Sequence, residues 1–346
     1  MTKAQRPDGL VLTSEYGYDR LRPSRRSGEI ARVRRGAWLV KGTEPEDEWE
    51  KEEHLLLARC HAAAATLRCR YAFTLQTAGF LLGWPAPVSR RLQILQTSRV
   101  ASGGSADLVR HHTTSLPDED IVFVEGLPVT VPSRTAIESA LGCEPPIGLA
   151  LVDAALRELA AVTRREREDS IARQDVWRDR LVDMLAERGS VRYARRARAA
   201  IRFSDGLAES GQESWMRWLA LSRGMPVPEL QVEIATCRGL RYPDALWRFR
   251  GAKPVLAEYD GADKYRRADG TSIILDEKDR ESLLTDATGG TFVRFTKRDR
   301  PDADAAFGRL LRATPLSESD LTPRPDLFLS SALRPLRRAA RGRDRG

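Results

Sequence analysis

Apolar and polar residues alternate most clearly near the N-terminus, between Ile30 and Val40. The run Glu29-Ile-Ala-Arg-Val-Arg-Arg-Gly-Ala-Trp-Leu-Val alternates on both sides of Gly36, as the two strands of a small ribbon do. Upstream, the apolar run that begins at Leu10 leads into a short polar stretch with helical character. The pattern therefore predicts a compact unit from about Gly9 to Gly42 that ends in a two-stranded ribbon.

Helical and extended patterns then succeed each other as far as about residue 200. The acidic run Glu44 to Glu53 indicates a linker or a helix start, and it leads into a helix-rich segment from His54 to Leu82. Three strands are expected next, at 92–96, 120–124 and 127–131. Ser133 is the expected N-cap of a helix from Arg134, and residues 134–200 are expected to be mostly helical, with a charged, solvent-exposed face over 164–202.

A different order of elements begins at Ser210. An apolar-faced helix is followed by three strands, a second helix and a last strand. A tight hairpin connection, Arg250-Gly-Ala-Lys, separates the second and third strands. The predicted elements are Glu213 to Arg223, Leu230 to Ala235, Tyr242 to Phe249, Pro254 to Tyr259, Asp276 to Ala287 and Thr291 to Thr296.

Together these patterns predict a multidomain protein between the α+β and α/β classes. The expected parts are a winged helix-turn-helix (1–45), a mixed α/β region (46–160), a charged helical connector (161–205), an α/β core like that of restriction endonucleases (206–312) and a basic tail without fixed structure (313–346). A chain of 346 residues is long enough for several such domains.

Charge and composition change this picture only in part. The net charge is +8, but six arginines and one aspartate between Ser331 and Gly346 account for +5 of it, so the body is only mildly basic. Arginine outnumbers lysine, which suits phosphate contacts, although genomic base composition produces the same bias. No stretch approaches the roughly 20 apolar residues of a membrane span. We expect a cytoplasmic protein without membrane association.

Cysteine and histidine spacing gives no indication of a metal site. Cys60, Cys69, Cys143 and Cys237 are scattered without a CxxC pair, so buried thiols are expected rather than disulfides or zinc. The four histidines lack acidic or thiol partners at ligand spacing. Ser102-Gly-Gly-Ser lacks the lysine of a phosphate-binding loop and indicates a turn.

Three acids in the C-terminal part form the strongest candidate site. Asp244 lies on one strand of the predicted hairpin, and Glu258 and Asp260 lie two residues apart at the end of the other. Residues 244 and 258 are symmetric about Gly251, so antiparallel pairing brings them together. Carboxylates gathered in this way suit Mg²⁺ or Mn²⁺. The alternative is a structural ion pair with Arg248 or Arg266.

The same segment resembles a nuclease superfamily. Tyr242-Pro-Asp-Ala-Leu-Trp, Ala257-Glu-Tyr-Asp-Gly, a charged helix and Phe292-Val-Arg-Phe are similar to the PD-(D/E)xK nucleases, in the branch of the very-short-patch repair endonucleases and the DUF559 proteins, over 210–297. The resemblance implies that Asp244 and Glu258 bind metal, that Asp260 replaces the usual lysine and that Glu213 is the helix acid near the site.

The resemblance also points to cations near these acids. Lys264 stands where relatives commonly have a histidine, which departs from the pattern and puts catalysis in doubt. A lysine there could hold the scissile phosphate or stabilise the transition state. Lys278 and Arg280 on the following helix are candidates for the same role, or else plain surface charges.

The front of the chain resembles a second family, the AbiEi-type antitoxins of type IV toxin–antitoxin systems. Arg32-Val-Arg-Arg-Gly-Ala-Trp-Leu-Val matches the wing, and Gly126-Leu-Pro-Val-Thr-Val-Pro-Ser-Arg-Thr-Ala matches a recurrent downstream segment, within 10–158. The likeness implies a recognition helix near Tyr16 to Arg26 in the major groove, with Arg32, Arg34 and Arg35 on the backbone or minor groove. Pro23 departs from a regular recognition helix.

Two classes of function remain open at this point. One is a DNA-binding protein with a Mg²⁺-dependent endonuclease domain. The other is a non-catalytic, antitoxin-like repressor that uses the nuclease fold for binding, with DNA and a toxin protein as partners. The missing histidine and the Asp260 substitution favour the repressor. Charge and fold also leave open an RNA-processing nuclease and a homo-oligomer.

Overall fold

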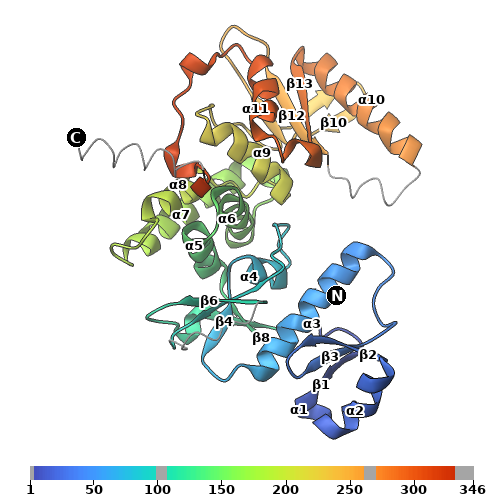
Figure 1. The fold of residues 1–346 in the computed structure, drawn as a ribbon. Helices are drawn as coiled ribbons and strands as arrows, with labels where there is room; N and C mark the ends of the chain where they lie inside the picture. The colour runs from blue at the N-terminus through green and yellow to red at the C-terminus, as the bar shows by residue number, and fades with distance from the viewer. Residues whose placement is uncertain (1–3, 99–106, 261–269, 332–346) are drawn as a thin grey trace, which may run out of the picture. The chain divides into compact units, whose positions relative to one another are not determined.

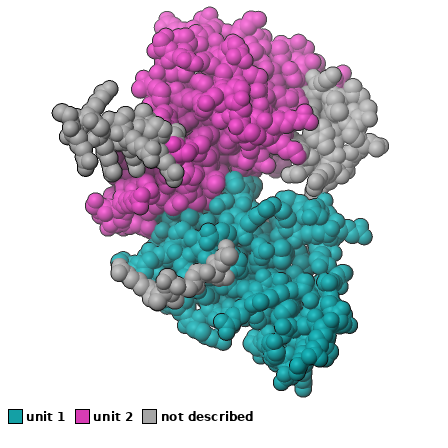
Figure 2. Space-filling model, in the orientation of Figure 1, with its two compact units in different colours: residues 1–138 teal, residues 139–346 magenta. Residues whose placement is uncertain are grey.

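A computed structural model describes residues 4–98, 107–260 and 270–331 of the chain. It divides into two compact units, residues 1–138 and 139–346 (Figure 2). The molecule is a mixed α+β protein with several small sheets and many helices (Figure 1). The finer five-part division stays a prediction.

The first unit begins with a three-stranded antiparallel sheet. Its elements are β1 (Leu10–Leu12), α1 (Thr13–Tyr16), α2 (Tyr18–Ser27), β2 (Ile30–Arg34) and β3 (Ala37–Val40), and the strand order is β1-β3-β2. The alternating pattern buries Ala37 and Leu39 against Leu10 and Leu12. Helix α3 (Glu48–Thr66) covers this core with Ala58 and Ala62. The predicted ribbon around Gly36 is confirmed.

Helix α2 contains Pro23 and ends at Gly28. Gly28 has a φ of 76°, the left-handed conformation that glycine adopts without strain, and its N–H donates to the carbonyl of Ser24. Leu21 is the buried residue of this helix, and the arginines on its other faces are exposed or half-buried. The helix thus buries one apolar side chain and presents a basic surface.

A five-stranded mixed sheet completes the first unit. Its strands are β4 (Tyr71–Phe73), β5 (Leu92–Gln96), β6 (Leu108–His112), β7 (Ile121–Val124) and β8 (Leu127–Thr130), in the order β6-β5-β4-β8-β7. The short helix α4 (Leu75–Leu81) follows β4. The predicted helix-rich segment over 54–82 is confirmed by α3 and α4, with the short strand β4 between them as an element that the sequence did not predict. Helix α5 (Pro132–Gly142) begins at Pro132, so Ser133 is not its N-cap.

Four helices form the first half of the second unit. They are α6 (Pro145–Leu159), α7 (Arg167–Ala186), α8 (Ala194–Phe203) and α9 (Gly211–Ser222). The expectation of a mostly helical stretch over 134–200 is confirmed. Its charged surface is interrupted by buried side chains, among them Gln174 on α7 and Arg196 on α8. These helices therefore pack into the unit along one side.

A small sheet in the second unit carries the candidate acids. Strand β12 (Val255–Asp260) pairs antiparallel with β11 (Ala245–Trp247) and parallel with β13 (Thr291–Thr296). The crossover helix α10 (Gly270–Thr288) joins β12 to β13, and α11 (Ala303–Arg312) follows. Strand β13 matches its prediction. The predicted strand 230–235 is instead β9 (Ile234–Thr236), which pairs with β10 (Gly239–Arg241) in a separate ribbon.

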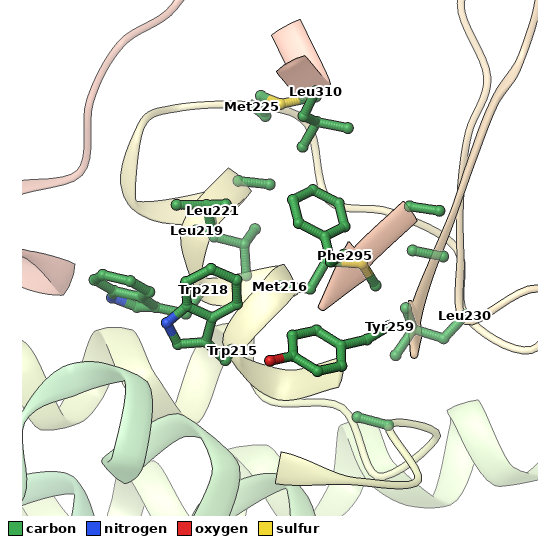
Figure 3. Packing of buried hydrophobic residues seen from close by; sticks show 14 of the residues in the cluster. Trp215, Met216, Trp218, Leu219, Leu221, Met225, Leu230, Tyr259, Phe295 and Leu310 are labelled. Carbon is green, nitrogen blue, oxygen red and sulfur yellow. The ribbon is translucent and has the colours of Figure 1, made fainter. Parts of the chain in front are cut away.

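Aromatic packing fixes α9 against this sheet (Figure 3). The ring of Trp215 lies 6.1 Å from that of Tyr259 on β12 and 6.4 Å from that of Phe295 on β13, in edge-to-face geometry. Trp218 donates its indole N–H to the carbonyl of Leu327 at 2.8 Å. Edge-to-face pairs and a satisfied indole stabilise such a core beyond simple burial. The start of α9 is thereby held beside the end of β12.

The cysteines differ from expectation in two cases, since Cys69 is half-buried and Cys237 is exposed. None of the four is in a disulfide, and Cys60 and Cys143 are buried as predicted, but Cys237 in the β9–β10 ribbon is exposed. Among the helices that the structure describes, none is both long and apolar enough to cross a membrane.

Candidate functional site

The hairpin places Asp244 beside Glu258. Ala245 pairs with Ala257 and Trp247 with Val255, so the register is symmetric about Gly251 as the sequence predicted, with Asp244 immediately before β11. Asp244 Oδ2 accepts a hydrogen bond from the backbone N–H of Tyr259 at 2.9 Å. The pKa of Asp244 is raised well above its ordinary value, first by removal from water and then by the negative charge of Glu213.

Glu213 joins this pair from the first turn of α9. Its carboxylate accepts hydrogen bonds from the backbone N–H of Glu209 at 2.7 Å and the hydroxyl of Ser210 at 2.9 Å, which caps the helix. The side chain is 8% exposed, and burial raises its pKa to about 7. The structure thus brings together Glu213, Asp244 and Glu258, the three acids that the sequence singled out on separate elements.

Two arginines neutralise the outer acids. Arg280 on α10 donates to Glu258 at 2.7 Å and to the carbonyl of Tyr242 at 2.7 Å. Arg294 on β13 donates to Asp260 at 2.7 Å. Arg280 had been expected to face phosphate or to be a plain surface charge, and the structure ties it to the acid cluster instead.

The other cations expected near the acids have different positions. Arg248 forms its ion pair with Glu229, so it is not the partner of the acid cluster. Lys264 and Arg266 lie outside the described residues, as does the side chain of Lys278 in α10. A structural ion pair was the alternative prediction for these acids, and the structure shows such pairs with Arg280 and Arg294 instead of Arg248.

The acid cluster in this arrangement does not fit a bound cation. Within residues 4–98, 107–260 and 270–331, no group of three or more His, Cys, Asp and Glu side chains is placed to hold a metal ion. Guanidinium groups hold the carboxylates of Glu258 and Asp260, and Asp244 accepts from the backbone. Any cation bound there would share the carboxylate of Glu258 with the guanidinium of Arg280.

A second candidate surface lies on the N-terminal elements. Arg32 and Arg35 are exposed on and beside β2, whereas Arg34 is 10% exposed and pairs with Asp107 at 3.1 Å. On α2, exposed arginines recur at Arg20, Arg22 and Arg26. The sequence predicted the range of this helix but not these side chains, although the spacing of Arg22 and Arg26 by four puts both on one face of a helix.

The guanidinium of Arg25 connects α2 to the ribbon. It lies 4.7 Å from the ring centre of Tyr18 and 4.5 Å from that of Trp38 on β3. Such cation–π contacts stabilise by about 0.5–1 kcal/mol each when they are partly exposed. Helix and ribbon are thus held together as one basic surface.

Comparison with known proteins relates the middle of the chain to one family. Residues 71–187 match the model of the AbiEi antitoxin C-terminal domain, a region that runs from β4 to the end of α7. Two uncharacterized proteins of Mycobacterium tuberculosis, from the CDC 1551 and H37Rv strains, are each 34% identical over 179 residues. The match covers 51% of this chain, which spans 57% of the length of each relative.

These matches support one of the two resemblances. The resemblance to antitoxins, expected over 10–158, is supported over 71–158, where it overlaps the matched residues. The comparisons give no support to a C-terminal PD-(D/E)xK domain. The acid cluster therefore depends on its own geometry for any functional role.

Proposed function

We propose that this chain is an antitoxin-like, DNA-binding regulator. Its N-terminal elements would act as a winged helix-turn-helix on DNA, and the region over 71–187 would contact a toxin protein. The main support comes from two adjacent parts of the chain. The first is a β1-β3-β2 sheet with two helices between β1 and β2, and the second is the region that matches an antitoxin domain.

The exposed arginines of the first unit suit such a role. Arg20, Arg22 and Arg26 stand on α2, which the proposal places in the major groove, and Arg32 and Arg35 stand on the ribbon beside the DNA backbone. Guanidinium groups bind phosphate bidentately, and neutralising phosphates releases counterions. Because Pro23 interrupts the hydrogen bonding of α2, we expect few base contacts and a large contribution from the backbone.

Replacing Arg22 and Arg26 by alanine tests this proposal. We expect the double variant to bind DNA at least about tenfold more weakly, with a salt dependence reduced by about two units of slope, because two phosphate contacts are lost. Fluorescence polarisation with labelled duplexes at several salt concentrations measures both quantities.

The matched control removes two exposed arginines from the second unit, Arg165 and Arg180. This control should bind DNA as the wild type does. Equal affinities for the wild type and both double variants would contradict the proposed DNA-binding surface. Purification of the full chain with the product of a neighbouring gene tests the toxin contact separately.

A metal-dependent nuclease is the second candidate function. Burial, and then the negative charges of the nearby Glu213 and Glu258, raise the pKa of Asp244. This gathering of acids favours a nuclease, together with a sheet whose β12 and β13 are joined by α10. The ion pair between Arg280 and Glu258 is evidence against a nuclease.

If the chain is a regulator, we expect supercoiled plasmid to stay intact with Mg²⁺ or Mn²⁺, equally for the wild type, Asp244→Ala and Glu258→Ala. Cleavage by the wild type that both variants lose would establish the nuclease instead.

A further inference from the structure

The first unit contains a cavity lined by arginines, of which only Arg32 and Arg35 are among the proposed DNA contacts. It has a volume of about 800 Å³ and lies between the ribbon, the end of α3 and strand β6. Among the described residues, six arginines and one aspartate line it, from elements far apart in the sequence: Arg32, Arg34, Arg35, Arg59, Arg68, Arg110 and Asp107. We propose that this cavity binds a small phosphate-rich anion, of the size of a di- or triphosphate.

The hydrogen bonding of these arginines leaves donors for a ligand. Arg34 pairs with Asp107, and Arg110 donates to Gln96 at 2.8 Å. Across the described parts of the chain, no carboxylate pairs with Arg32, Arg35 or Arg68. A group of like charges without counterions is unfavourable, and a multivalent anion relieves that repulsion.

Arg59 also has a donor that no described residue accepts. Its Nε is buried and has no hydrogen-bond partner among the described residues, while one Nη donates to the carbonyl of Arg90 at 3.3 Å. An unsatisfied buried donor costs about 1–3 kcal/mol, so such groups usually have a ligand, an ion or water beside them.

The size and lining of the cavity favour a small ligand over a duplex. Its volume falls within the range of about 300–1,000 Å³ that is typical of small-molecule sites. Arg34 is 10% exposed, so the convex surface of a DNA rod would not reach it. Val33, Ala65 and Leu67 supply the apolar lining, and no described aromatic side chain lines the cavity to stack on a base. The phosphate chain is therefore the group we expect to be recognised.

A bound anion would also affect the ribbon. Arg32, Arg34 and Arg35 belong to β2 and its turn, so a ligand that engages them reduces the positive charge available to DNA. By linkage, DNA and the anion would weaken each other's binding by the same factor. This second step depends on the proposed DNA-binding function, whereas binding of the anion does not.

Calorimetric titration of the full chain with tripolyphosphate, and separately with ATP, at physiological salt tests the site. We expect saturable binding to one site and at least about a tenfold loss of affinity in Arg59→Met with Arg68→Ala, because two guanidinium contacts are removed. Arg68→Lys should lose less affinity, since lysine keeps the positive charge but lacks the planar, two-pronged donor group of arginine. Equal affinity for both ligands identifies the phosphate chain as the recognised group, and tighter ATP binding identifies a nucleotide.

The Arg22→Ala with Arg26→Ala variant is the matched control, because both side chains lie outside the cavity. It should bind tripolyphosphate as the wild type does even if it no longer binds DNA, which separates the two proposals. Urea unfolding verifies that each variant is folded. Absence of binding by either ligand, or affinities that are the same in wild type and in the Arg59 and Arg68 variant, would overturn the proposal.

Discussion

Replacing Arg217 by methionine is expected to lower the free energy of unfolding by about 3–5 kcal/mol, because it leaves Asp153 buried without its partner. Arg217 on α9 and Asp153 on α6 are each 1% exposed, and their nearest N and O atoms are 2.7 Å apart. The other Nη of Arg217 donates to the carbonyl of Phe203 at 2.6 Å, at the end of α8. One guanidinium thus joins three helices of the second unit.

The destabilisation follows from the unpaired acid more than from the lost arginine. Desolvation already raises the pKa of Asp153 above its ordinary value, in spite of the adjacent guanidinium. Converting both members, Arg217→Met with Asp153→Leu, should therefore recover much of the lost stability, as buried ion pairs replaced together often do.

Arg223→Met is the matched control for this prediction. Arg223 directly follows α9 as its C-cap, but it pairs with Asp304, whose side chain is 92% exposed. Such pairs contribute little, so this variant should stay within about 0.5 kcal/mol of the wild type. Urea midpoints followed by tryptophan fluorescence measure all four proteins. Equal midpoints for Arg217→Met and Arg223→Met would contradict the argument.

Local patterns were sufficient to predict the ribbon, the hairpin and strand β13. Each depends on residues within a few positions of one another: the alternation around Gly36, the turn at Arg250 to Lys253 and the apolar run that ends at Thr296. The symmetry of residues 244 and 258 about Gly251 then placed the two acids opposite each other at the end of the hairpin. Part of the candidate site could therefore be predicted from residues that are close together in the sequence.

Ion pairs between residues far apart in the sequence could not be predicted from local patterns. Arg280 reaches Glu258 from 22 positions away, and Arg34 reaches Asp107 from 73 positions away. A charged side chain carries no sequence signal that selects its partner among many carboxylates, because tertiary packing makes that choice. The arginine cavity, with Arg59, Arg68 and Arg110 on separate elements, is hidden in sequence for the same reason.

Stability of the second unit is expected to fall as the pH rises from about 4.5 to 7, because Glu213 holds its proton more tightly when folded. Its pKa is about 7 in the folded protein against an ordinary 4.5, so the folded state binds more protons in this window. The difference corresponds to about 3 kcal/mol. Below pH 4.5 the contribution is fully present, and above pH 7 it is lost.

Glu213→Gln should remove much of this pH dependence. Its amide oxygen still accepts from the N–H of Glu209, and its amide nitrogen donates to the Ser210 hydroxyl, so the helix cap is kept. The variant should equal the wild type at acidic pH and exceed its stability at pH 8. Asp244→Asn should act in the same direction, since burial and the charge of Glu213 raise the pKa of that acid too.

Urea unfolding at acidic pH and at pH 8, in buffer with a chelator, measures these differences without interference from metal ions. Glu187→Gln, at an exposed glutamate just after α7, controls for a general loss of negative charge. If Glu213→Gln gives no more stability at pH 8 than Glu187→Gln does, the acids are not crowded as the structure places them. A larger gain in stability for Glu213→Gln would instead show that the carboxylate of Glu213 destabilises the protein beside Asp244 at neutral pH. This is expected because Arg280 neutralises only one side of the acid cluster.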